Sequence, residues 1–134
     1  MDDAPNPGLD PETLESVVAC FDVVRDGDSV KLADLLNHGL PANLTNDKGD
    51  TLLILAAYHK HLECIDLLLE AGADHSRIND RGQTALGSAV FRQDVKAVKR
   101  LLAAGAEPGG GSPSAIEVAK QFELGEMLEL LSNR

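Results

Sequence analysis

Aromatic side chains are scarce in this chain of 134 residues: tryptophan is absent, and one tyrosine and three phenylalanines make up 3% of the sequence. Hydrophobic residues nevertheless reach 43%, so the core has to be built from leucine, alanine, valine and isoleucine. A domain of this length buries roughly two thirds of the surface that its unfolded chain exposes, so it can fold without cross-links. This composition suits short helices that pack closely together.

Cysteines and long apolar runs are also lacking. The two cysteines, Cys20 and Cys64, cannot form a disulfide framework, and both fall at apolar positions of the helical pattern described below, so we expect reduced core residues. No apolar run approaches the roughly 18 residues that a membrane span needs. The first residues, MDDAPNPGLDPE, lack the basic and apolar regions of a secretory signal. We therefore expect a cytoplasmic protein.

Basic charge is the third deficit. Twelve lysines and arginines face 22 aspartates and glutamates, which gives a formal net charge of −10. Such a field repels phosphate backbones and anionic lipid headgroups, so nucleic acids and membrane surfaces are not expected as partners. The charge favours solubility, and a second interpretation is attraction to a basic protein.

The strongest positive signal is an internal repeat. Sliding the chain against itself by 33 positions brings like residues together over most of its length, which is the signature of a repeat architecture. The residues paired by this interval are Gly49 and Gly82, Thr51 and Thr84, Leu53 and Leu86, Ala56 and Ala89, Leu68 and Leu101, Gly72 and Gly105, and Ala73 and Ala106.

Each period predicts two helices. Thr51 is suited to cap a short first helix, and residues 62–71 carry apolar side chains at helical spacing. Gly72 and Gly105 then follow the second helix, where a residue without a β-carbon can adopt the left-handed conformation that ends it. The buried positions expected in the first helix are Leu53, Ala56 and Ala57.

Residues 49–74, GDTLLILAAYHKHLECIDLLLEAGAD, and residues 82–107, GQTALGSAVFRQDVKAVKRLLAAGAE, resemble the G-x-T-P-L-H-x-A-A…L-L-x-x-G-A-D pattern of ankyrin repeats. The resemblance covers about residues 20 to 131. It implies an all-α ankyrin-repeat solenoid, in which antiparallel helix pairs stack side by side and loops project from one edge. Each unit cannot bury its own apolar face, so its neighbours complete the core.

The family's histidine is absent from both repeats, because its tetrapeptide is TLLI at residues 51–54 and TALG at residues 84–87. In ankyrin repeats this histidine helps to tie one unit to the next by hydrogen bonds, so the resemblance implies a thinner polar network between units here. Gly87 inside a helix is expected to cost ~1 kcal/mol relative to alanine.

The chain is predicted to be a disordered tail, residues 1–9, followed by one domain, residues 10–134. Asp10 and Pro11 suit the N-cap and first position of a helix that runs from Thr13 to about Asp26, before Gly27 turns the chain. We divide the domain into a capping unit at 10–45, repeats at 46–78 and 79–111, and a second capping unit at 112–134.

The second capping unit follows a shortened loop, since Ala119 matches Ala89 at an offset of 30. We interpret residues 109–111 as a tight turn rather than a flexible linker because a helical pair follows them. Ser112 and Pro113 are predicted to open a helix at 115–121, and a last helix is predicted at 123–131. Its inward side chains would be Met127, Leu128 and Leu131.

No catalytic, metal or cofactor site is expected, and we predict that the protein is not an enzyme. His59, His61 and Cys64 are residue types that bind zinc, but His61 lies where ankyrin repeats commonly have a structural residue and Cys64 falls on a core position. His38 and His75 lack a catalytic partner at a suggestive spacing and are expected to be solvated. Four loop aspartates without the spacing of a calcium loop are expected at polar loop tips. They are Asp47, Asp50, Asp74 and Asp80.

Ankyrin proteins generally bind partners through the loop tips and the exposed face of each first helix. Tyr58 and Phe91 hold the same repeat position, and aromatics beside arginine are typical of interface hot spots; alternatively, both rings only stabilise the fold. The predicted partner-binding residues are Arg25, Asp26, Asp47, Lys48, Asp50, Tyr58, His59, Asp80, Arg81, Gln83, Phe91 and Arg92. The second helices carry a mixed-charge, solvated face with Glu63, Asp66, Glu70, Lys96, Lys99 and Arg100.

The function predicted from these features is a monomeric module that binds another protein through its concave loop and first-helix surface. One alternative is a small acidic inhibitor or immunity-type protein that sequesters a basic enzyme or toxin. Another is a structural protein that assembles with copies of itself. Fold alone does not choose among them.

Overall fold

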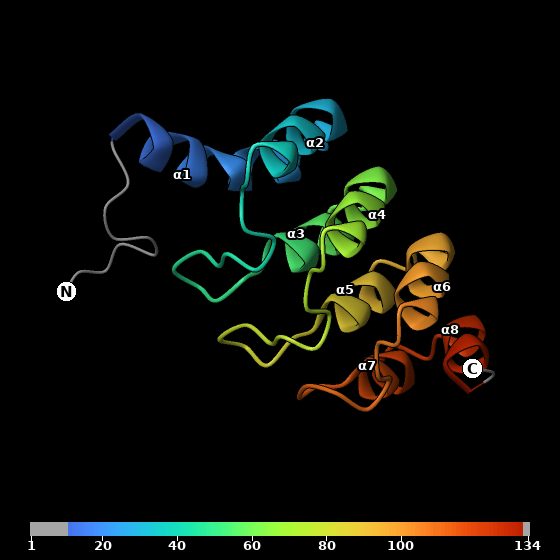
Figure 1. Cartoon of the computed structure of the whole chain (residues 1–134). Coiled ribbons are helices and arrows are strands. Elements are labelled where there is room, and N and C mark those ends of the chain that lie inside the picture. Colours follow the sequence, from blue (N-terminus) through green and yellow to red (C-terminus); the bar gives the residue numbers. More distant parts are fainter. Residues whose placement is uncertain (1–10, 133–134) are drawn as a thin grey trace.

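The computed structural model describes residues 11–132, and this part of the chain contains eight α-helices arranged in pairs (Figure 1). Besides the helices, only isolated bridges occur there, from Thr45 to Thr51 and from Gly111 to Ser114. The all-α prediction is confirmed. The tail predicted at residues 1–9 and the N-cap predicted at Asp10 lie outside the described residues. The helices are α1 (Pro11–Asp26), α2 (Ser29–Asn37), α3 (Leu52–Tyr58), α4 (Leu62–Glu70), α5 (Ala85–Phe91), α6 (Val95–Ala103), α7 (Ala115–Gln121) and α8 (Gly125–Ser132).

The helices stand in two rows. The odd-numbered helices α1, α3, α5 and α7 form one row, the even-numbered helices form the other, and each helix contacts the next member of its own row (Figure 1). Three long loops, before α3, α5 and α7, extend from the same edge of the stack. This is the solenoid that the repeat predicts.

The caps predicted from the repeat are present. The Thr51 hydroxyl accepts a hydrogen bond from the Ile54 amide at 3.0 Å, and the Thr84 hydroxyl accepts one from the Gly87 amide at 3.0 Å. Each satisfies an amide that the helix itself leaves unpaired. Gly72 and Gly105 follow the second helices with φ of 90° and 102°, the left-handed conformation that ends them.

The last helix pair departs from the prediction. Helix α7 is capped by Ser114, not opened by Ser112 and Pro113: the Ser114 hydroxyl accepts from the Glu117 amide, and the Glu117 carboxylate accepts from the Ser114 amide. This reciprocal pair is a capping box, which satisfies two helix-end donors at once. Helix α8 begins at Gly125 rather than at residue 123, because Glu123 has a left-handed φ of 55° in the turn between the helices.

The first helices of the two repeats lie in the centre of the core. Residues 52–57 of α3 and residues 85–90 of α5 are buried throughout, because each helix is covered by its neighbours in the row and by the second helix of its own unit. Cys20 and Cys64 are fully buried and form no disulfide, as expected of core residues. Burial is the main reason why the pKa of each thiol is raised to about 11.

Polar links join the units although Ile54 and Gly87 replace the family's histidine. The His61 ring donates from Nε2 to the Arg25 carbonyl at 2.8 Å, and the Asp80 amide donates to the Lys48 carbonyl at 3.0 Å. The Ser112 amide reaches the Gly82 carbonyl at 2.9 Å. The expected loss of polar contacts is therefore offset by links through the loops and the turns between helices.

Candidate binding groove

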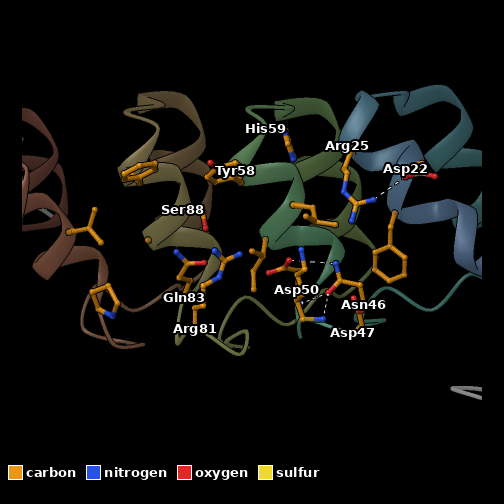
Figure 2. A pocket seen from close by; sticks show the side chains of 18 of the residues that line it. Asp22, Arg25, Asn46, Asp47, Asp50, Tyr58, His59, Arg81, Gln83 and Ser88 are labelled. Atoms are coloured by element: carbon orange, nitrogen blue, oxygen red, sulfur yellow. Dashed lines mark hydrogen bonds and ion pairs between the residues drawn. The ribbon is translucent and has the colours of Figure 1, made fainter. Parts of the chain in front are cut away.

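A groove of about 760 Å³ runs along the first helices, between their C-terminal ends and the projecting loops. Figure 2 shows Arg25, Tyr58 and His59 on the helix side and Asp50, Arg81 and Gln83 on the loop side. The structure brings most of the predicted binding residues together there: Arg25, Asp47, Lys48, Asp50, Tyr58, His59, Arg81, Gln83 and Phe91 line the groove. Asp26, Asp80 and Arg92 lie outside its lining.

A row of half-exposed rings borders the helix side. Tyr58 and Phe91 are 41% and 45% exposed, and their rings stack with centroids 6.4 Å apart and an angle of 7° between the planes. Phe122 continues the row, with its centroid 5.5 Å from that of Phe91. The Arg92 guanidinium lies over the Tyr58 ring, 5.2 Å from its centroid, which is a cation–π arrangement. The repeat pattern predicts two members of this row and misses Phe122.

Phe122 was missed because it lies one position out of register. At the offset of 30 that relates the last unit to the one before, the residue equivalent to Phe91 is Gln121, and Phe122 is equivalent to Arg92. It follows the last residue of α7 as a C-cap, yet its ring still contacts Phe91. A search for aromatics one position either side of the repeat register would have found it.

His59 and His61, at the end of α3 and the start of α4, contact other protein groups rather than form a metal site. The ring of His59 lies 5.2 Å from Tyr58, edge to face, and 6.3 Å from His61. The pKa of His59 is lowered, first by desolvation and then by the nearby charges of His61, Arg25 and Arg92, so the neutral ring is favoured. Among residues 18–132, whose side chains the structure describes, no three histidine, cysteine or acidic side chains are placed to hold a metal ion. His61 donates to the Arg25 carbonyl and Cys64 lies in the core.

Asp50 was predicted to lie exposed at a polar loop tip, but its side chain is buried, with 7% exposure. The Asn79 side-chain amide of the next loop donates to it at 2.7 Å. The same Asn79 also folds its own loop, because its Oδ1 accepts from the amides of Arg81 and Gln83, each at 2.9 Å. Asn46 holds the preceding loop in the same way, accepting from Lys48 and Asp50. The burial of Asp50 could not be read from its own repeat, because the group that satisfies it belongs to the next one.

The two other histidines differ from each other. His38 is exposed, and its Nδ1 donates to the Asp34 carbonyl at 2.7 Å. His75 is partly buried, and its Nδ1 is shielded from solvent without a hydrogen-bond partner among the described residues. The prediction that His75 is solvated is wrong, because its ring lies against the turn after α6, where Gly105 approaches it.

The groove does not share the acidity of the molecule. Its lining contains three acidic residues, Asp22, Asp47 and Asp50, and three basic ones, Arg25, Lys48 and Arg81, whereas the chain has 22 acidic against 12 basic residues. Asp22 accepts an ion-paired hydrogen bond from Arg25 at 3.0 Å, and Asp50 is bonded to Asn79. The lining charges left for a partner are those of Asp47, Lys48 and Arg81.

The second helices carry the mixed-charge face on the other side of the stack. One ion pair crosses between α4 and α6, where Arg100 Nε lies 3.3 Å from Asp66 Oδ1. Lys96 and Lys99 on α6 and Glu63 and Glu70 on α4 are exposed. Such a face is typical of solvent-exposed helices.

The sequence of this stack matches the family model for ankyrin repeats, in three copies, over residues 20–110. The chain belongs to the ankyrin-repeat family. Ankyrin repeats are generally protein-binding modules, and proteins of the family are usually non-catalytic.

A curated relative comes from Pseudomonas aeruginosa, where it carries the name of an ankyrin repeat protein, PA3287. It is 52% identical over 67 residues, which is 50% of this chain and 39% of the relative. The chain thus matches less than half the length of this relative. In the described part of the present ankyrin-repeat protein, no helix has both the length and the apolar character needed to cross a membrane.

Proposed function

We propose that this ankyrin-repeat protein binds another protein in the groove between its first helices and its loops, and that it does so in the cytoplasm. The observation that carries the proposal is the row formed by Tyr58, Phe91 and Phe122, which stays 41% to 51% exposed although the core of the same helices is closed. Aromatics of this kind, with arginine beside them, are the residues that most often contribute binding energy at interfaces.

The exposure of the rings argues against a purely structural role. A ring that only stabilised the fold would be expected to bury most of its surface, since stabilisation follows the apolar area removed from water. Tyr58 and Phe91 instead stack on each other and line the groove, where part of each ring stays open to solvent. A partner that covers them would bury apolar area that the fold leaves open.

The test is affinity capture on the immobilised full chain, compared with the double variant Tyr58→Ala, Phe91→Ala. Loss of hot-spot residues is expected to weaken partner binding by about 30-fold or more, equivalent to roughly 2 kcal/mol. Helical content measured by circular dichroism should stay the same, because neither ring belongs to the buried core. Val30→Ala removes an 81% exposed apolar side chain from α2, away from the groove, and is the matched control.

Three results would contradict the proposal. Equal capture by the double variant and by the parent chain would move the binding surface away from the rings. A concentration-independent dimer in light scattering would favour self-assembly, the second function that the sequence leaves open. A captured basic protein whose binding depends on the acidic outer face, and not on the rings, would favour the inhibitor role that the charge of −10 suggests.

A further inference from the structure

The smallest side chains that line the groove belong to α5. Gly87 and Ser88 line it there, while the equivalent residues of α3 are Ile54 and Leu55 and the residue of α7 equivalent to Ser88 is Val118. All of these residues line the same groove. The lining side chains of α5 are thus smaller than those of α3 and than Val118 of α7 at this point of the groove. We call the hollow formed over Gly87 and Ser88 the α5 hollow.

The walls of the α5 hollow have opposite character. Tyr58 and Phe91 border it on the helix side, and Arg81 and Gln83 border it on the loop side. Figure 2 shows Ser88 between Tyr58 and the pair formed by Gln83 and Arg81. The hydroxyl of Ser88 is already bonded to the Thr84 carbonyl at 3.0 Å, so the floor offers no free polar group and suits an apolar side chain.

The charges that border the α5 hollow are positive. Arg81 lines it, and the Arg92 guanidinium lies over the adjacent Tyr58 ring. Neither arginine forms an ion pair within the part of the chain that the structure describes, whereas the nearest groove carboxylate, Asp50, is buried and bonded to Asn79. An acidic protein thus presents unpaired cations beside an apolar hollow. Complementary charge on the partner would be negative.

We propose that the α5 hollow receives one apolar side chain from an acidic segment of a partner protein, with a carboxylate next to that side chain placed on Arg81 or Arg92. This inference rests on the proposed function and specifies the partner's chemistry at that site. It differs from the expectation drawn from total charge, because the acidity of the chain lies mainly outside the groove.

A defined probe tests the proposal without the natural partner. A random 12-residue peptide library displayed on phage is selected against the full chain, and the enriched class is then made as fluorescent peptides. The expected class has one leucine-sized residue flanked by aspartate or glutamate. Enrichment of lysine- and arginine-rich peptides, or enrichment of no class, would overturn the proposal.

Two changes examine the α5 hollow itself. Ser88→Leu copies the residue that the preceding repeat already carries as Leu55, and it should weaken the selected peptide at least tenfold by filling the floor. Replacing the peptide's own apolar residue by alanine should weaken binding by a similar factor in the unchanged protein, so the test stands even if Ser88→Leu does not fold. Full binding of the alanine peptide would show that no side chain enters the hollow.

Charge is tested with a matched pair of variants. Arg81→Glu should weaken the acidic peptide about tenfold and flatten the dependence of affinity on salt concentration, because it removes an attractive contact and adds a repulsive one. Lys99→Glu makes the same change of charge on the outer face of α6, where the side chain is exposed, and should leave the affinity within about twofold. Equal effects of the two variants would mean that only net charge matters, which overturns the assignment of the site.

The outcomes separate this inference from the proposed function. If the Tyr58 and Phe91 double variant loses peptide binding while Ser88→Leu and Arg81→Glu keep it, the groove binds proteins but the α5 hollow is not the specificity site. If all of these variants bind as the parent chain does, both proposals fail.

Discussion

Replacing Asn79 by alanine tests whether the loops hold neighbouring repeats together. Asn79 is 5% exposed, accepts two backbone hydrogen bonds within its own loop and donates one to the carboxylate of Asp50 in the preceding unit. The two neutral bonds contribute about 1 kcal/mol each, and a bond to a charged group contributes about 1.5–3 kcal/mol. The substitution also leaves Asp50 buried without its best partner. We expect a loss of about 3–5 kcal/mol in the free energy of unfolding.

Asn46→Ala is the matched control for this prediction. Asn46 holds the equivalent position 33 residues earlier and accepts the same two backbone bonds, from Lys48 and Asp50, but its amide lies 3.5 Å from the Asp50 carboxylate of its own loop. Its substitution should therefore cost about 1–2 kcal/mol. Asn79 also donates to Gln83 Oε1 at 2.9 Å, where Asn46 has its 3.5 Å contact with Asp50, so the difference between the variants, about 2 kcal/mol or more, comes mainly from the bond that crosses from one repeat to the next.

Urea denaturation followed by circular dichroism measures both variants, and a double-mutant cycle with Asp50→Ala measures the coupling between Asp50 and Asn79. Coupling of about 1.5 kcal/mol or more is expected for a buried, charge-assisted pair. Equal losses for Asn79→Ala and Asn46→Ala, together with no coupling to Asp50, would refute the argument that this bond links the repeats.

Two further predictions concern backbone space and buried thiols. Gly27→Ala should lower the free energy of unfolding by at least ~1 kcal/mol more than Gly39→Ala, measured by thermal or urea unfolding. Both glycines have positive φ, but only at Gly27 would an added β-carbon meet the His61 ring, 2.5 Å from Nδ1, and disturb the hydrogen bond from His61 to the Arg25 carbonyl. Similar losses in the two variants would show that the His61 contact is unimportant. The pKa of the Cys64 thiol is raised from 9.0 to about 11, so the unfolded chain ionises first and the free energy of unfolding should fall between pH 9 and pH 11, by about 1.4 kcal/mol per pH unit from this thiol. Cys64→Ala should reduce the slope by that amount in urea titrations at pH 8, 9 and 10, and an unchanged slope would contradict the shift.

The fold was predictable because its signals are local and repeated. A threonine before an apolar segment and a glycine after the next one, both recurring at 33 residues, fix where helices begin and end, and Thr51, Thr84, Gly72 and Gly105 have these roles in the structure. Most of the groove residues were also predictable, since stacking places equivalent positions side by side. The division into units at residues 45, 78 and 111 stays a prediction.

What the sequence missed depends on contacts between units. Asp50 is buried by Asn79, 29 residues away, and nothing in its own loop distinguishes it from an exposed aspartate. Ser114, rather than Ser112, caps α7 at the position that the offset of 30 makes equivalent to Thr84, and Phe122 lies one position beyond the equivalent of Phe91. His75 is sheltered by the turn at Gly105 in the next repeat. The errors at Asp50, His75 and Phe122 arose where the repeat ceases to be exact or where a neighbour supplies the partner, whereas the cap at Ser114 was missed although the offset of 30 points to it.

The small residues of α5 show how a modular stack can change what it recognises without altering its backbone. Ile54 and Gly87, like Leu55 and Ser88, occupy equivalent sites on helices with matching caps and lengths. Exchanging these two pairs would transfer the cavity to the adjacent module, about 10 Å along the stack, since packed helices lie 8–10 Å apart. Four substitutions on an unchanged backbone would thus reset the spacing between the cavity and the cationic loop, so related proteins with the same scaffold can bind partner groups that are spaced differently.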